Sequence, residues 1–263
     1  MKQLLSGKKI IKTFGVGEEK HRVLNEVSVT IGSGEFVSIM GPSGSGKSTL
    51  LYALSGMDGI DSGEVAFEGR RLSGLSDDAL SDLRRNRMGF VFQQPTLLKN
   101  LNILDNIILP QTRDRKRNVK QLTAKARLLM RQMGIEDLEE RDITQASGGQ
   151  LQRAGICRAL MGEPGIVFGD EPTGALNTKA AKEIMELFTK INQDGIAILL
   201  VTHDPNIAAR TERVLFLSDG EILDQCRLSK YTERDFDKRV SEIIRRMQKI
   251  CLLYTSPSPR DTR

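Results

Sequence analysis

The sequence feature that most constrains the fold is the glycine-rich segment at residues 41–49, which reads GPSGSGKST. It matches the pattern G-x-x-x-x-G-K-S of phosphate-binding loops. A strand-like apolar segment at 36–40 precedes it and a helix-like segment at 49–54 follows it, which is the context this motif requires. A glycine-rich turn with an unrelated lysine would lack that context. The segment therefore predicts a strand–loop–helix unit.

The residue types of this loop suit a phosphate group. Its glycines let the backbone curl so that successive N–H groups point at phosphate oxygens, and the following helix presents its positive end to the same anion. Lys47 adds a mobile charge for the β- and γ-phosphates, and the Ser48 hydroxyl can ligate Mg²⁺. We therefore expect a bound nucleotide.

Composition narrows the class of protein. A chain of 263 residues fits one large domain or one domain with an insertion. The three cysteines are widely spaced, match no metal pattern and suit a reducing compartment. The absence of Trp and the 5% aromatic content argue against a base-stacking nucleic-acid surface. No apolar run reaches the roughly 18–20 residues of a membrane span, and the N-terminus has no secretory apolar core. We therefore expect a cytosolic chain, at most peripheral to a membrane.

Strand-like and helix-like segments alternate along most of the chain. Strands are predicted within 8–31 as a pair, at 89–92, at 166–169, at 197–202 and within 214–223 as a pair, and helices at 77–87, 103–133, 147–161 and 178–193. This alternation favours an α/β fold with a mostly parallel sheet covered on both faces. The stretch at 94–146 contains no predicted strand and is interpreted as an inserted helical subdomain.

Four polar residues follow predicted strands. Asp170 and Glu171 come directly after the strand at 166–169, where they fit a Mg²⁺-holding carboxylate and a base for an attacking water. His203 follows the strand at 197–202 and could reach a γ-phosphate, although a single histidine is more often structural. Gln93 ends another strand and could touch Mg²⁺ or the water.

Two further features leave alternatives open. Phe14, just before a glycine-containing turn, could stack on a flat ring or belong to the core. Residues 232–250 predict an amphipathic helix, which either packs on its own domain or has a regulatory or membrane-facing role. Residues 251–263 resemble the in-frame translation of a sequencing-library adapter. We therefore expect the natural C-terminus near Ile250 and a disordered tail beyond it.

The motifs together resemble an ABC-type ATPase over roughly residues 1–225. The phosphate loop, Gln93, the SGGQ segment at 147–150, Asp170, Glu171 and His203 occur in that family's order and approximate spacing. The SGGQ segment is the most specific element, because ordinary phosphate-loop proteins lack it. The segments GFVFQ at 89–93 and DEPTGAL at 170–176 resemble the subgroup that serves macrolide export, lipoprotein release and antimicrobial-peptide resistance. The helix at 232–250 looks most like the antimicrobial-peptide, bacitracin-type branch.

The resemblance implies a P-loop NTPase core (about 1–93 and 147–227), with an N-terminal antiparallel β part and an inserted helical subdomain. It implies that Phe14 stacks on adenine, that Glu171 activates water and that His203 bridges to the γ-phosphate. Gln93 would sense that phosphate and, with Ser48 and Asp170, serve Mg²⁺. The implied residues for the phosphates of ATP are Gly41, Ser43, Gly44, Ser45, Gly46, Lys47, Ser48 and Thr49. Ser147, Gly148, Gly149 and Gln150 would contact ATP bound to a second protomer.

The implied function is that of the ATPase subunit of a bacterial ABC transporter. It would form an ATP-sandwich homodimer and dock on a separate membrane permease at the inner face of the cell membrane, for export of or resistance to antimicrobial peptides. The alternative is an ABC ATPase of lipoprotein release or cell division that does mechanical work without moving a solute. Asn177 stands where the family usually has Asp, and Ala146 where it usually has Leu. Neither change touches the groups expected to hold or cleave ATP.

Overall fold

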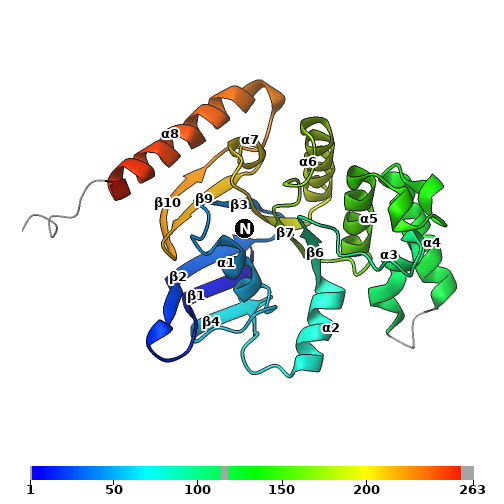
Figure 1. Ribbon diagram of the computed structural model, residues 1–263, viewed down its shortest axis with the longest axis horizontal. Coiled ribbons are helices and arrows are strands. Elements are labelled where there is room, and N and C mark those ends of the chain that lie inside the picture. The colour runs from blue at the N-terminus through cyan, green and yellow to red at the C-terminus, as the bar shows by residue number, and fades with distance from the viewer. Residues whose placement is uncertain (1, 114–117, 256–263) are drawn as a thin grey trace, which may run out of the picture.

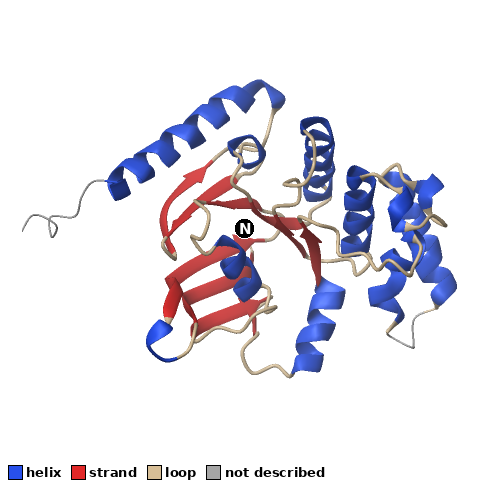
Figure 2. Ribbon diagram, in the orientation of Figure 1, coloured by secondary structure: helices blue, strands red, loops and turns tan. Residues whose placement is uncertain are grey.

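The computed structural model describes residues 2–113 and 118–255. Two sheets, with helices packed around them, make up this part of the chain (Figure 1 and Figure 2). In the described residues, no helix combines the length and apolar character that crossing a membrane would require.

The larger sheet carries the edge at which the site is built. Its strand order is β10-β9-β3-β8-β7-β6. The strands are β3 (Phe36–Met40), β6 (Met88–Phe92), β7 (Ile166–Asp170), β8 (Ala197–Val201), β9 (Arg213–Ser218) and β10 (Glu221–Arg227). All neighbours pair in parallel except β10 with β9. Every residue of β3 and β8 is buried, as expected for central strands covered on both faces. The carboxyl ends of β3, β7 and β8 therefore meet at one edge.

The smaller sheet is antiparallel and confirms the predicted N-terminal β part. Its order is β2-β1-β4-β5, from strands β1 (Gln3–Phe14), β2 (His21–Gly32), β4 (Ser62–Phe67) and β5 (Arg70–Arg71). The short helix η1 (Gly17–Glu19) joins β1 to β2. Helix α1 (Lys47–Leu54) contacts strands of both sheets and lies between them (Figure 2). The start of α1 is thereby held at the edge of the larger sheet.

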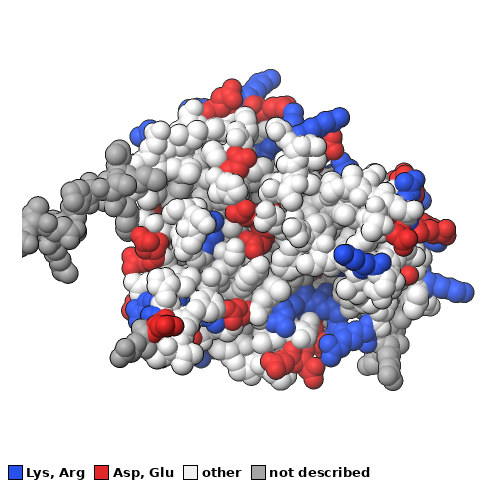
Figure 3. Space-filling view, viewed as in Figure 1, with Lys and Arg blue, Asp and Glu red and all other residues white. Residues whose placement is uncertain are grey.

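Some helices form a lobe beyond β6, which is an edge strand of the larger sheet, and others cover that sheet (Figure 1). Their bounds are α2 (Asp77–Arg87), α3 (Ile103–Thr112), α4 (Val119–Gln132), η2 (Glu136–Leu138), η3 (Ile143–Gln145), α5 (Gly148–Leu160), α6 (Thr178–Gln193), α7 (Pro205–Ala208), η4 (Glu233–Asp235) and α8 (Phe236–Thr255). In Figure 3, Lys and Arg gather over the region of α2 while Asp and Glu are scattered, so the net charge of +5 is not spread over this face as one basic surface.

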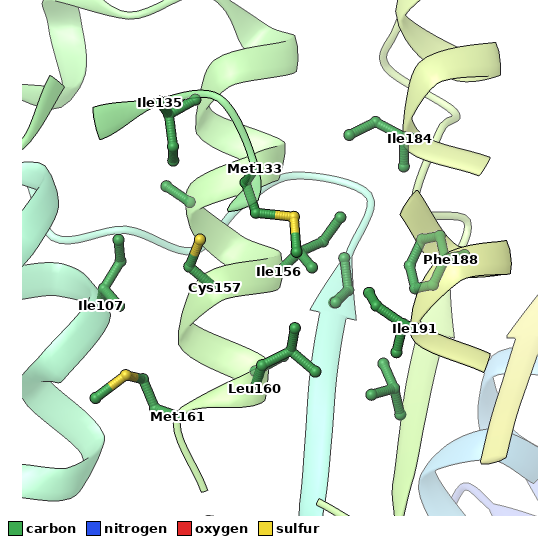
Figure 4. Packing of buried hydrophobic residues seen from close by; sticks show 14 of the residues in the cluster. Ile107, Met133, Ile135, Ile156, Cys157, Leu160, Met161, Ile184, Phe188 and Ile191 are labelled. Atoms are coloured by element: carbon green, nitrogen blue, oxygen red, sulfur yellow. The ribbon is translucent and has the colours of Figure 1, made fainter. Parts of the chain in front are cut away.

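The helical lobe shares its core with the helices that flank it. Figure 4 shows Ile107 of α3 and Cys157 of α5 on one side of this core, and Phe188 of α6 on the other. The subdomain expected at 94–146 thus contains α3 and α4, while α5, just past that boundary, packs against both. The reason is that α5 is almost entirely apolar where it faces them, as its buried residues show.

The last helix differs in length from the expectation. A helix was predicted to end near Ile250, whereas α8 runs to Thr255. Residues 251–255 contain neither Gly nor Pro, and the next helix-breaking residue is Pro257. The disorder expected beyond Ile250 stays a prediction; the structure draws residues 251–255 as the last part of α8, and residues 256–263 lie outside the described part.

Candidate active site

The phosphate loop has the backbone shape that an anion needs. Gly44 and Gly46 have φ angles of 79° and 95°, a region that favours glycine. A Cβ atom at Gly46 would lie 2.7 Å from the carbonyl oxygen of Val23. Gly46 is also the N-cap of α1 and has no side chain to cap the helix. The first N–H groups of α1 are therefore left available to a ligand.

Lys47 is buried at the first position of α1. Its ammonium donates to the carbonyl oxygen of Pro42 at 2.7 Å. Burial lowers the pKa of Lys47, while the charges of Glu171 and Asp170 act in the opposite direction. The hydroxyl of Ser45 is buried and has no hydrogen-bond partner within the described chain. A cation and an unpaired hydroxyl beside free N–H groups fit a phosphate chain.

Asp170 is held by two hydroxyl groups of α1. The Oγ of Ser48 donates to Oδ1 of Asp170 at 2.8 Å, and the hydroxyl of Tyr52 donates to Oδ2 at 2.6 Å. Ser48 and Asp170 are thus adjacent, and hydroxyl and carboxylate oxygens are ligands that suit Mg²⁺. These two residues fit the expected metal site. Tyr52 was not predicted, although it lies four residues after Ser48 and hence on the same helix face.

Glu171 and His203 form a pair at the carboxyl ends of β7 and β8. Glu171 has a φ angle of 45°. Its N–H donates to the carbonyl oxygen of Val201 at 3.0 Å, a backbone contact that fixes the position of the carboxylate. Nδ1 of His203 lies 3.0 Å from Oε1 of Glu171. Since a carboxylate only accepts hydrogen bonds, Nδ1 is the donor, and the ring is oriented by Glu171.

One large cavity, of about 900 Å³, brings most of the expected residues together. Residues from the phosphate loop line it together with Glu171, His203 and Phe14. Phe14 is 46% exposed, so it is not a core residue, and the Lys12 ammonium lies 5.0 Å from its ring centroid. The unpredicted residues Met247 and Ile250 also line this cavity.

The SGGQ segment lies elsewhere. Ser147 is the N-cap of α5: its Oγ accepts from the N–H of Gln150 at 3.3 Å, and Gln150 Oε1 accepts from the N–H of Ser147 at 2.8 Å. This capping box fixes the start of the helix. The segment opens into a separate cavity of about 440 Å³, which Asn177 also lines. The phosphate loop and the SGGQ segment of one chain therefore do not share a site.

Gln93 also lies apart from the main cavity. It is exposed after β6 and packs beside Gly174, where a Cβ atom would come within 2.9 Å of the Gln93 amide nitrogen. The same Cβ would lie 3.3 Å from Oε2 of Glu171, so Gln93 is next to the Glu171 loop. Asn177, three residues after Gly174, caps α6, because its Oδ1 accepts from the N–H of Ala180 at 2.9 Å.

Comparisons with known proteins agree with this site. The family described as ABC transporter matches residues 24–174. The macrolide export ATP-binding/permease protein MacB of Chlorobaculum tepidum is 42% identical over 215 residues, which are 82% of this chain and 33% of that protein. The chain thus spans about a third of the length of this relative. The uncharacterized ABC transporter ATP-binding protein MJ0796 of Methanocaldococcus jannaschii is 41% identical over 86% of this chain and 98% of that protein.

The fold agrees as well. The solved dimeric structure of a post-hydrolysis state of the MJ0796 cassette, bound to ADP and Pi, superimposes with a TM-score of 0.80 and 38% identity. The superposition covers 87% of this chain and 100% of the MJ0796 chain. We conclude that the chain belongs to the ABC transporter family, as an ATPase cassette of its macrolide-export and lipoprotein-release subgroup.

Proposed function

We propose that the chain hydrolyses ATP as a homodimer, in which each ATP lies between the phosphate loop of one protomer and residues 147–150 of its partner. The observation that carries this proposal is the separation of the two cavities. The loop opens into one cavity and the SGGQ segment into another. The segment can therefore contact a nucleotide only when that nucleotide is bound to the phosphate loop of a second protomer. The backbone N–H groups at the start of α5 then supply a second anion-binding helix end.

The side chains that line the main cavity, together with Asp170 beside Ser48, divide the chemistry between them. Glu171 accepts a proton from the attacking water as its oxygen bonds to the γ-phosphorus and the bond to the β–γ bridging oxygen breaks. Lys47 offsets the negative charge of the phosphates, and His203, oriented by Glu171, contacts the γ-phosphate. Ser48 and Asp170 would hold Mg²⁺, which would offset the charge that builds up on the leaving oxygens.

We further propose that this ATPase binds a membrane permease at the cytoplasmic face of the cell membrane and drives it. Support comes from the MacB relatives, whose names describe an ATP-binding/permease protein of which this chain matches a third. We propose antimicrobial peptides as the cargo, because of the resemblance of the last helix to the bacitracin-type branch. The relatives' names favour macrolides as the second candidate. Susceptibility of a gene-disrupted strain to bacitracin and to erythromycin separates the two.

Glu171→Gln tests the catalytic assignment. We expect phosphate release by the purified protein to fall by about a hundredfold or more, with ATP binding retained, because the amide cannot accept the proton. Glu186→Gln, at an exposed position of α6, is the matched control and keeps the normal rate. Unchanged turnover in Glu171→Gln contradicts the assignment.

The slow Glu171→Gln protein also tests the dimer. With ATP, it forms a dimer that light scattering detects. Adding Ser147→Arg places a bulky side chain at the start of α5 and abolishes this dimer, while each monomer still binds ATP. A normal ATP-dependent dimer in the double variant would contradict the proposed dimer, in which residues 147–150 contact the ATP of the partner.

A further inference from the structure

The last helix, α8, reaches the main cavity. Ile243 of α8 is fully buried and packs in one cluster with Val214 and Phe216 of β9. Met247 and Ile250 follow at the i+4 and i+7 positions, so they continue the same helix face. Ile250 lies about 10 Å farther along the helix than Ile243. The side chains of Met247 and Ile250 line the cavity that the phosphate loop also lines. Figure 1 shows α8 running alongside β9 and β10.

Two arginines fix α8 in this position. Arg239 is only 4% exposed, and its guanidinium donates to the carbonyl oxygens of Ala209 and Thr211, both at 2.6 Å. Arg246 donates to Oδ2 of Asp224 in β10 at 2.8 Å, directly before Met247. These contacts and the burial of Ile243 hold the helix on the sheet. Met247 and Ile250 therefore have a fixed position in the lining of the cavity.

The cavity is lined by both polar and apolar side chains. Lys47, Ser48, Glu171 and His203 are polar lining residues. The apolar lining residues are Phe14, Val23, Phe216, Leu217, Met247 and Ile250. A nucleoside triphosphate needs both kinds of group, because it has a charged phosphate chain and a flat base that is largely apolar on its faces. The α8 side chains thus supply two of the apolar groups available to a base.

We propose that Met247 and Ile250 are nucleotide-binding residues, which contact the base of ATP and make α8 one wall of its slot. This inference rests on the proposed placement of the phosphates at residues 41–49. It assigns to α8 a role in affinity for the nucleoside, separate from the role of the loop in holding phosphate. The loop and α8 are therefore expected to respond to different parts of the ligand.

Two probes separate these roles: ATP, and inorganic tripolyphosphate, which lacks the nucleoside. Calorimetric titration without Mg²⁺ measures the binding of each to the full-length protein. Met247→Ala and Ile250→Ala are each expected to weaken ATP binding about fivefold, because each removes apolar contact with the base. Tripolyphosphate binding should stay within about twofold of the wild type, a change of less than half a kcal/mol.

The matched control is Ile244→Ala, on the same helix but 38% exposed and not among the cavity-lining residues. It should leave both affinities unchanged. Met247→Leu, which keeps the apolar volume, should restore ATP binding and guards against a folding defect in Met247→Ala. A double-mutant cycle with Phe14→Ala should show non-additive losses, since both side chains contact one base.

Three results would overturn the proposal. In the first, both alanine variants bind ATP as the wild type does. In the second, they lose ATP and tripolyphosphate equally, so that α8 acts only through the loop. In the third, the wild-type protein binds ATP no more tightly than tripolyphosphate. Failure of the wild type to bind either probe would instead remove the phosphate site, and with it the function proposed above.

Discussion

The hydroxyl of Tyr52 gives the sharpest test of how the carboxylate of Asp170, which we propose holds Mg²⁺, is positioned. It donates to Oδ2 of Asp170 at 2.6 Å, while Ser48 occupies Oδ1. Burial, together with the hydrogen bond and charge of Asp170, raises the pKa of Tyr52 above its ordinary value of 10. The hydroxyl therefore stays protonated, and so remains a hydrogen-bond donor, at pH values up to 10. Tyr52→Phe removes this donor while keeping the ring.

The size of the effect follows from the kind of hydrogen bond. A hydrogen bond to a charged group contributes about 1.5–3 kcal/mol. Tyr52 and Asp170 are half-buried, so water partly replaces the hydroxyl and the lower value applies. Since about 1.4 kcal/mol equals a factor of ten, the Mg²⁺ concentration for half-maximal ATPase activity should rise about tenfold. The rate at saturating Mg²⁺ should change by less than about twofold, because Tyr52 does not line the cavity.

The assay is phosphate release as a function of Mg²⁺ concentration at fixed ATP. Tyr231→Phe is the matched control: its ring contacts the guanidinium groups of Arg210 and Arg239, and its hydroxyl makes no hydrogen bond within the described residues. It should leave the Mg²⁺ dependence unchanged. An unchanged Mg²⁺ dependence in a folded Tyr52→Phe protein would refute the positioning role. The wild-type enzyme should also show no loss of activity from Tyr52 ionisation as the pH rises to 10, because the raised pKa keeps the hydroxyl protonated.

Two further predictions concern stability. Asn177→Ala should lower the free energy of unfolding by about 1 kcal/mol, because it removes the N-cap of α6, whereas Asn177→Asp should keep the cap and change it by only a few tenths. Urea unfolding measures both, and an equal loss in the two variants would contradict the capping role. Arg239→Met should cost about 3 kcal/mol, because it leaves the carbonyl oxygens of Ala209 and Thr211 without their buried donor. Arg245→Met, at an exposed position, should change stability by less than about 0.5 kcal/mol, and a small effect at Arg239 would show that α8 is held by its apolar face alone.

Much of the fold was accessible from the sequence because its signals are local. Glycines that require positive φ, apolar strands that precede Asp170 and His203, and the capping box at Ser147 all act within a few residues. The alternation of strands and helices then predicted a mostly parallel sheet, and parallel strands place their carboxyl ends at one edge. Glu171 and His203, each expected after a strand, meet at that edge because β7 and β8 are neighbours.

Other features depended on contacts between distant segments. Tyr52 reaches a carboxylate 118 positions away, and α8 lines the same cavity as the phosphate loop because β9 lies beside β3 in the sheet. Sequence periodicity indicates which face of α8 is apolar, but not what that face covers. The end of α8 also differs from the expected one near Ile250, since residues 251–255 carry no local stop signal.

The sequence by itself therefore determined the phosphate loop, the carboxylates, the histidine and the SGGQ segment, because short-range backbone geometry and hydrogen bonding specify each of them. Only the tertiary structure decided which of these segments lie together in one cavity and which lie apart. It places the loop and the SGGQ segment of one chain in different cavities and brings Met247 and Ile250 to the loop. The physical reason is that strand order and helix packing, which sum many weak contacts between distant residues, set those distances.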